Sequence, residues 1–198
     1  MQLHAHPLSG NVHKVRLLLG ILDLAYEEVP VDIPAGAHKS AAFLEMNPLG
    51  QVPVLVDGSV TLRDSQAILI YLARRYDPSR TWLPDDAEAM GRIAQWLSFA
   101  ANEIHHGASL ARLHFLLGVP VDLPAAQERA RTGLAHLDRR LDGREWLELD
   151  RPTIADLACF PYAALAPEGQ VPLDAYPNLQ AWIGRVKALP GYVAMPGL

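Results

Sequence analysis

The sequence has a single cysteine, Cys159, among its 198 residues. This excludes a disulfide framework, a Cys-x-x-Cys redox pair and a cysteine-based zinc site. Cys159 lies in an apolar helical stretch and is expected to be buried and unreactive. No run of about 18 apolar residues occurs, and residues 1–7 lack the features of a secretion signal. We therefore expect a cytoplasmic protein that does not contact a membrane.

Positive charge is also scarce: 17 lysines and arginines face 22 aspartates and glutamates, for a net charge of −5. The basic residues are dispersed among acids and form no basic stripe, so a nucleic-acid partner is not expected. The eight histidines show no His-Glu-x-x-His or comparable ligand spacing, so no metal site is expected. Half of the residues are apolar, which is enough for a chain of this length to bury a core.

The first third of the chain predicts a mixed α/β domain. Strand patterns cover residues 3–5, 27–33, 52–56 and 59–62, and helical patterns cover residues 11–24 and the segment after 65. Pro30 lacks a ladder donor and places its strand at a sheet edge. Asp57-Gly58 predicts a type I′ hairpin turn. Asp64-Ser65 predicts a helix start.

The rest of the chain predicts helices only. Residues 77–86 are rich in proline and aspartate and are expected to be a linker. A long helix over residues 90–111 follows, then a helix that Pro124 opens. Thr153 to Asp156 predicts a capping box, and Pro177 opens the last helix. The expected organisation is an α/β domain over 1–76, the linker over 77–86 and an all-helical domain over 87–198.

Three segments of the first domain are candidates for ligand binding. Ser9-Gly10-Asn11 precedes a helix, where free N–H groups favour an anion and Gly10 permits close approach of a ligand; an ordinary N-cap has the same composition. Pro53 in a cis bond would turn the N–H and C=O of Val52 toward an extended peptide, although trans is the commoner form. Asp64-Ser65 suits either a helix cap or a site for amino and carboxylate groups.

Together these segments resemble the N-terminal domain of glutathione S-transferases. Leu8 to Asn11, followed by Lys14-Val15-Arg16, is similar to bacterial members that have a serine in the active-site loop. Thr153 to Asp156 resembles the capping box of the family's second domain. The resemblance covers nearly the whole chain and implies a thioredoxin-like α/β domain, an all-α C-terminal domain and a homodimer.

The resemblance implies that glutathione is the co-substrate and that no metal takes part. Ser9 matches the hydroxyl that donates to the glutathione sulfur, and Asn11 lies where some members place an amide near that sulfur. Val52 matches the residue whose backbone pairs with the cysteinyl unit, before the family's cis-proline at Pro53. No tyrosine or cysteine occupies the catalytic loop, which disfavours disulfide-exchange chemistry.

The resemblance also assigns the two ends of the tripeptide. Asp64 and Ser65 match the acidic and hydroxyl pair that holds the γ-glutamyl end, although the family more often has a glutamate at the position of Asp64. The residues matched to the glycyl carboxylate are His38, Lys39 and Gln51.

The function implied is a transferase that activates the glutathione thiolate for attack on a hydrophobic electrophile. Asn102, His106 and Arg112 lie on or near the long helix of the second domain, where they either shape the electrophile pocket or form a solvated polar face. The same scaffold would also suit a glutathione-dependent isomerase, reductase or dehalogenase, or a non-catalytic binding or regulatory dimer.

Overall fold

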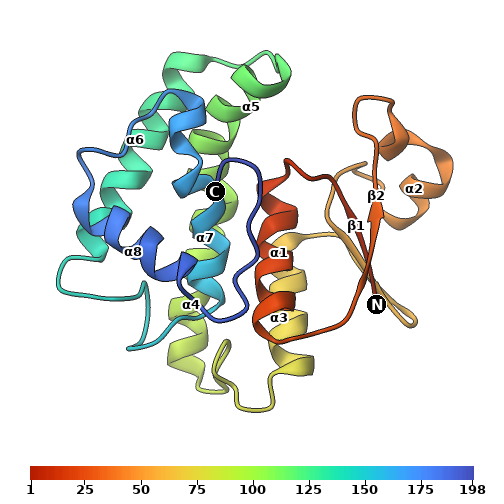
Figure 1. Cartoon of the computed structure of the whole chain (residues 1–198), viewed down its shortest axis with the longest axis horizontal. Coiled ribbons are helices and arrows are strands. Elements are labelled where there is room, and N and C mark those ends of the chain that lie inside the picture. Colours follow the sequence, from red (N-terminus) through yellow and green to blue (C-terminus); the bar gives the residue numbers. More distant parts are fainter.

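A four-stranded sheet with strand order β2-β1-β3-β4 organises the first part of the chain (Figure 1). The computed structural model describes residues 1–198. The strands are β1 (Gln2–Ala5), β2 (Glu27–Pro30), β3 (Val54–Asp57) and β4 (Val60–Leu62). β1 runs parallel to β2 and antiparallel to β3, which is antiparallel to β4. The strand containing Pro30 lies at the sheet edge, where the missing N–H breaks no ladder.

The hairpin between β3 and β4 differs from the expected type I′ turn. Asp57 pairs with Val60, so the turn residues are Gly58 and Ser59. Only Gly58 has a positive φ, at 60°, which matches the pattern of a type II′ turn. Tyr71 donates a 2.8 Å hydrogen bond to Asp57 Oδ2, so this aspartate is held in the strand rather than in the turn.

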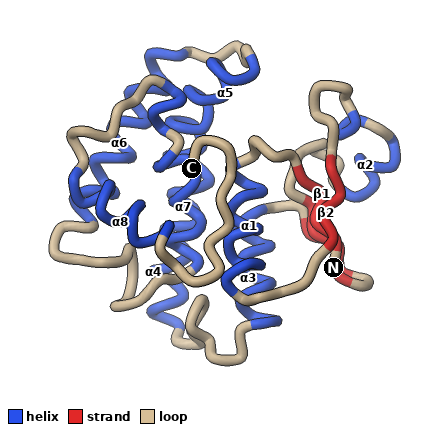
Figure 2. The backbone as a smooth tube through the Cα atoms, viewed as in Figure 1, coloured by secondary structure: helices blue, strands red, loops and turns tan.

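Helices cover both faces of the sheet (Figure 1; Figure 2). α1 (Gly10–Ile21) and α3 (Ser65–Tyr76) lie between the sheet and the helical part of the molecule, while α2 (Ala41–Met46) follows the short η1 (Ala37–Lys39) on the other face. Ser9 and Asp64 are the N-caps of α1 and α3. Both helix starts were predicted from these polar residues.

The second part of the chain is entirely helical, which confirms the predicted fold class. No helix or strand lies between Tyr76 and Ala87; the domain boundaries themselves stay predictions. The elements are α4 (Ala87–Phe99), the π-helical η2 (Ala100–Ser109), α5 (Leu110–Leu117), α6 (Leu123–Arg140), α7 (Ile154–Ala164), η3 (Ala166–Gly169) and α8 (Pro177–Lys187). None of these helices combines the length and apolar character that crossing a bilayer requires.

The predicted capping box begins α7 and anchors the helical core. Asp156 is fully buried and accepts hydrogen bonds from Thr153 N (2.9 Å), Leu147 N (3.0 Å) and Trp182 Nε1 (2.9 Å). The carboxylate therefore joins α7 to α8 as well as capping it. Cys159 on the same helix is buried, and burial raises the pKa of its thiol, as expected for an unreactive cysteine.

The C-terminal segment after α8 returns to the first part of the chain. It is the dark blue segment that runs beside α1 in Figure 1. His13 Nε2 lies 2.7 Å from the carbonyl oxygen of Val193. A Cβ added to Gly20 would lie 2.5 Å from the carbonyl oxygen of Gly191, so only glycine permits this crossing. Gly191 and Val193 therefore pack against α1.

Candidate functional site

A cleft of about 780 Å³ lies between the sheet domain and the helices η2, α5 and α7. The sheet domain contributes mostly polar residues to it. These are His6, Ser9, Asn11, His38, Lys39, Gln51, Asp64, Ser65 and Gln66. The helical side adds a mixed wall with polar residues near η2 and leucines along α5. Of the residues proposed to touch the peptide co-substrate, all but Pro53 line this one cleft.

Ser9 lies at the edge of the cleft as the N-cap of α1. Its Oγ accepts a 3.3 Å hydrogen bond from the N–H of Val12. A hydroxyl has one donor hydrogen in addition to its acceptor lone pairs, so capping leaves the O–H of Ser9 free to donate. The N-cap and donor interpretations of this residue are therefore compatible.

Positive electrostatic potential adds to this donor. The N-terminus of α1 carries a partial positive charge. Lys14, one turn along α1, is buried, and its Nζ lies 5.5 Å from the centre of the Tyr162 ring. Burial lowers the pKa of Lys14 to about 8, with Cys159 and Asp64 acting in the opposite direction. At neutral pH most of this ammonium is charged, and no carboxylate forms an ion pair with it.

Gly10 has a different role from the one expected. A Cβ at this position would lie 2.7 Å from Cε1 of Tyr162. The space that a side chain would need is therefore filled by the Tyr162 ring and not by a ligand. Gly10 permits close packing of the helical domain against the start of α1.

The Val52–Pro53 peptide bond is cis. Val52 lines the cleft, and its N–H and C=O make no hydrogen bond within the chain. Pro53 is buried behind it at the start of β3. Val52 therefore presents both backbone groups for pairing with an extended peptide.

Asp64 and Ser65 lie where α3 meets α1. Asp64 Oδ1 accepts a 2.9 Å hydrogen bond from the N–H of Ala67, and its other carboxylate oxygen makes no hydrogen bond. Ser65 Oγ lies 3.0 Å from Gln66 Oε1 and 3.5 Å from Asn11 Oδ1. This arrangement places a hydroxyl beside Asn11 and a free carboxylate oxygen on the preceding residue, Asp64.

Comparison with known proteins agrees with this geometry. The model of the glutathione S-transferase N-terminal domain matches residues 1–74, and that of the C-terminal domain matches residues 121–190. Glutathione S-transferase 3 of Zea mays is 33% identical over 97% of this chain and 91% of its own length. The chain belongs to the glutathione S-transferase family.

Solved structures of family members support the same fold. A glutathione S-transferase from Xanthobacter autotrophicus has a TM-score of 0.90 and 33% identity, with coverage of 99% of this chain and 97% of its own. A glutathione transferase homologue from Drosophila mojavensis has a TM-score of 0.86 and 27% identity, with coverage of 96% and 89%. The structure of that homologue contains bound glutathione.

The remaining residues assigned to glutathione surround one end of the cleft. Lys39 Nζ donates to the carbonyl oxygens of Leu49 (3.2 Å) and Gly50 (3.4 Å). His38 is half-buried, and its Nδ1 is buried without a partner. Gln51 is exposed beside them, so a cation, an imidazole and an amide meet at this end.

The helical wall differs from the sequence-based expectation. Arg112 lines the cleft, but Asn102 and His106 do not. His106 Nδ1 pairs with the carbonyl oxygen of Asn102 at 2.9 Å. Asn102 lines a separate hollow of about 670 Å³ between η2 and α6. The structure therefore does not bring these two residues to the predicted electrophile site.

Sequence reasoning missed three polar residues of the wall: His105, Ser109 and Tyr162. Ala101, His105 and Ser109 of η2 line the cleft at a spacing of four residues, and Leu113 of α5 continues the row. The i, i+4 spacing of His105 and Ser109 was the only signal in the sequence. Burial lowers the pKa of His105, with smaller contributions from His106 and Lys14, and this favours its neutral imidazole.

Arg112 links the helical wall to the active-site loop. Its Nη1 donates a 2.7 Å hydrogen bond to the carbonyl oxygen of Leu8, and its Nε donates a 2.6 Å hydrogen bond to Glu168 Oε2. The side chain is 2% exposed. One of its donors is thus committed to the residue before Ser9 and another to Glu168. No cluster of three or more histidine, cysteine, aspartate or glutamate side chains in the chain has the geometry to hold a metal.

Proposed function

We propose that this family member is a serine-type glutathione transferase, in which Ser9 donates a hydrogen bond to the glutathione thiolate. The observation that carries the proposal is the free O–H of Ser9 at the N-terminus of α1, in the same cleft as Val52, Asp64 and Ser65. These residues supply a hydrogen-bond donor (Ser9), a backbone edge for pairing (Val52) and a carboxylate-hydroxyl pair (Asp64 and Ser65). Together they suit one extended tripeptide.

The energetics of thiol activation are within reach of this arrangement. A free thiol has a pKa of about 8.5, so only a few per cent is thiolate at pH 7. Each unit by which the pKa falls requires about 1.4 kcal/mol of preferential binding to the thiolate. A hydrogen bond to a charged group contributes roughly 1.5–3 kcal/mol. Ser9 and the helix terminus together would lower the thiol pKa by about one to two units.

We assign the other contacts by chemistry. The N–H and C=O of Val52 would pair with the cysteinyl unit, with Pro53 fixing the bend. Asp64 and Ser65 would hold the γ-glutamyl end, the free Oδ2 of Asp64 accepting from its ammonium group. His38, Lys39 and Gln51 would bind the glycyl carboxylate. Asn11 would contribute an amide near the same sulfur.

The thiolate would then attack an electrophile held against the helical wall. Leu113, Leu116, Leu117 and Val119 give that wall an apolar part suited to a hydrophobic substrate. A role in detoxification in the cytoplasm and a homodimeric assembly complete the proposal. Isomerase, reductase and dehalogenase reactions would use the same activated thiolate, and a purely binding or regulatory dimer would not need one.

The test is a pH titration of the absorbance of glutathione thiolate, with and without the protein. Binding to wild-type protein is expected to lower the thiol pKa by about one to two units, and Ser9→Ala is expected to abolish most of that shift. Ser40→Ala is a matched control, because Ser40 caps α2 by accepting from Phe43 N at 3.3 Å and lies outside the cleft. Ser40→Ala is expected to lose capping stability while keeping the pKa shift.

Two results would contradict the proposal. A normal thiol pKa in the bound wild-type complex would indicate binding without activation. A full shift in Ser9→Ala would leave activation in place but remove Ser9 from its role, with Asn11 and the backbone N–H groups as the remaining donors.

A further inference from the structure

Lys14 is a buried cation that the fold leaves without a partner. The residue is 1% exposed, and its ammonium makes no hydrogen bond or ion pair within the chain. Buried lysines are nearly always paired, because taking the charge out of water is costly. An apolar side chain would fill a purely structural position on α1 without that cost. The unpaired charge therefore indicates a ligand of opposite sign.

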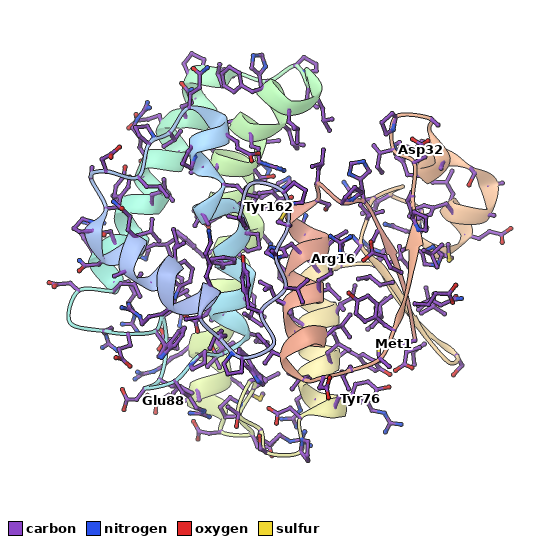
Figure 3. The ribbon with its side chains drawn as sticks, in the orientation of Figure 1. Met1, Arg16, Asp32, Tyr76, Glu88 and Tyr162 are labelled. Atoms are coloured by element: carbon purple, nitrogen blue, oxygen red, sulfur yellow. The ribbon has the colours of Figure 1, made fainter.

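The ammonium of Lys14 lies near the N-terminal end of α1. Side chains of a helix lean toward its N-terminus, so Lys14 reaches back toward residues 9–11. Its Nζ lies 5.5 Å from the centre of the Tyr162 ring, and the same ring packs against Gly10. Figure 3 shows Tyr162 where α7 meets the start of α1. The charge is therefore close to the loop that holds Ser9.

The titratable groups around Lys14 come from three other elements. Asp64 at the start of α3 favours the charged form of Lys14, and Lys14 in turn lowers the pKa of His105 in η2. Cys159 and Tyr162 belong to α7, and the Cys159 thiol stays neutral because burial raises its pKa. Asp64 is thus the one carboxylate whose charge acts on Lys14. In the proposed complex the γ-glutamyl ammonium would neutralise Asp64, which leaves a thiolate to compensate Lys14.

We propose that Lys14 is the counter-cation of the glutathione thiolate and that its charge adds to the hydrogen bond from Ser9. The inference rests on the proposed function and adds to it a residue that makes none of the peptide-binding contacts. On binding, the thiol proton would leave to solvent while the ammonium keeps its own proton. A cation within about 4–6 Å lowers the pKa of an acid by about 1–3 units, and the effect falls with distance. We expect Lys14 to account for about half a unit of the thiol shift.

The charge of Lys14 also depends on pH, which distinguishes it from an arginine. Burial lowers the pKa of Lys14 to about 8, so the free protein loses this charge progressively above that pH. The advantage of a thiol ligand over one without an ionisable sulfur is therefore expected to decline at alkaline pH. An arginine has a pKa above about 12 and would preserve the advantage.

The test compares wild-type protein with Lys14→Met, which has a similar length and no charge. In the absorbance titration of the bound thiolate, Lys14→Met is expected to raise the thiol pKa by about half a unit. A second measurement is the affinity for glutathione divided by the affinity for S-methylglutathione, which cannot form a thiolate. Lys14→Met is expected to lower this ratio about two-fold at pH 7.5 and to leave the affinity for S-methylglutathione unchanged.

Arg16→Met is the matched control. Arg16 is a second buried cation of α1, but its Nε donates a 2.8 Å hydrogen bond to Glu28 Oε2 in β2, so its charge is already paired. This variant is expected to lose stability and to keep the thiol pKa of the wild-type complex. An equal rise of the thiol pKa in Arg16→Met would show a general effect of disturbing α1 and would overturn the inference.

Lys14→Arg tests the inference if the methionine variant folds poorly. The affinity ratio is expected to decline above pH 8 in wild-type protein but not in Lys14→Arg, and equal declines would overturn the inference. A wild-type thiol shift that persists in full in Lys14→Met overturns the role of Lys14 alone. Failure of the wild-type protein to lower the thiol pKa overturns the proposed function and this inference with it.

Discussion

His13 is a buried histidine whose surroundings favour the neutral ring. Nε2 donates to the carbonyl oxygen of Val193, while Nδ1 is buried without a partner. Burial lowers the pKa of His13 to about 4, and the hydrogen bond to Val193 only partly opposes this. As the pH falls, His13 is protonated near pH 6.5 in the unfolded chain but only near pH 4 in the folded chain. The free energy of unfolding therefore loses nothing to His13 above pH 6.5, and it falls as the pH decreases toward 4.

We predict that lowering the pH from 7.5 to 5 reduces the free energy of unfolding by about 2 kcal/mol through His13. The measurement is urea denaturation of wild-type protein and His13→Phe at both pH values. The variant loses the Val193 hydrogen bond at either pH, but its stability is expected to vary less with pH. His106→Gln is a control, because His106 is exposed and lies elsewhere. Parallel pH dependences of wild type and His13→Phe would contradict the prediction.

At the scale of elements, Arg112 holds α5, η3 and the active-site loop together. A Cβ on Gly169 of η3 would lie 2.9 Å from the backbone nitrogen of Arg112, so these elements are in direct contact. We predict that Arg112→Met lowers kcat for glutathione conjugation about ten-fold and raises the thiol pKa, because Leu8 and Ser9 lose their support. Steady-state kinetics and the thiolate titration measure the two effects.

Two further variants separate positioning from general destabilisation. Arg112→Lys keeps a cation within reach of Leu8 and is expected to recover part of kcat. Arg131→Met removes an exposed ion pair with Glu128 and is expected to change neither quantity. An Arg112→Met protein with a normal thiol pKa would show that the arginine supports the fold but not the loop.

At the scale of the molecule, large apolar side chains remain exposed on the surface. Leu49 is 54% exposed after α2, Ile70 is 40% exposed on α3, and Met90 is 38% exposed on α4. We predict that they are covered in a homodimer of about twice 21.7 kDa. Light scattering measures the mass, and Leu49→Glu with Met90→Glu is expected to give the monomer. Wild-type protein that stays monomeric at micromolar concentration would contradict this prediction.

Much of the fold was predictable because the deciding signals are local. Pro30 lacks a donor and could only lie at an edge. Asp64 and Thr153 cap helices through contacts with residues two or three positions away. The capping box of α7 and the helix starts are therefore confirmed. The predicted position of the turn after β3 was wrong by one residue, because Asp57 contacts Tyr71, which belongs to the distant helix α3.

The cleft was predictable mainly on its sheet-domain side, since Arg112 is the one helical residue that was expected there and lines it. There the candidate residues sit on short loops whose ends are set by the sheet. The sequence left Asn102 and His106 either to the electrophile pocket or to a solvated polar face. Both are exposed outside the cleft, because the face of η2 that meets it carries Ala101, His105 and Ser109. The space beside Gly10 likewise depends on Tyr162, which is 152 positions away in sequence, counted from residue 10 to residue 162.

The return of the C-terminal segment to α1 has a consequence for how the protein is made. A chain grows from its N-terminus at about 5–20 residues per second, and early domains usually fold as they emerge. Here the carbonyl group of Val193 and the backbone of Gly191 are synthesised long after α1. The part of α1 that Gly191 and Val193 cover therefore stays uncovered until these residues have been made. A ribosome stalled before residue 190 would hold a chain that contains every strand but lacks the Val193 carbonyl with which His13 bonds.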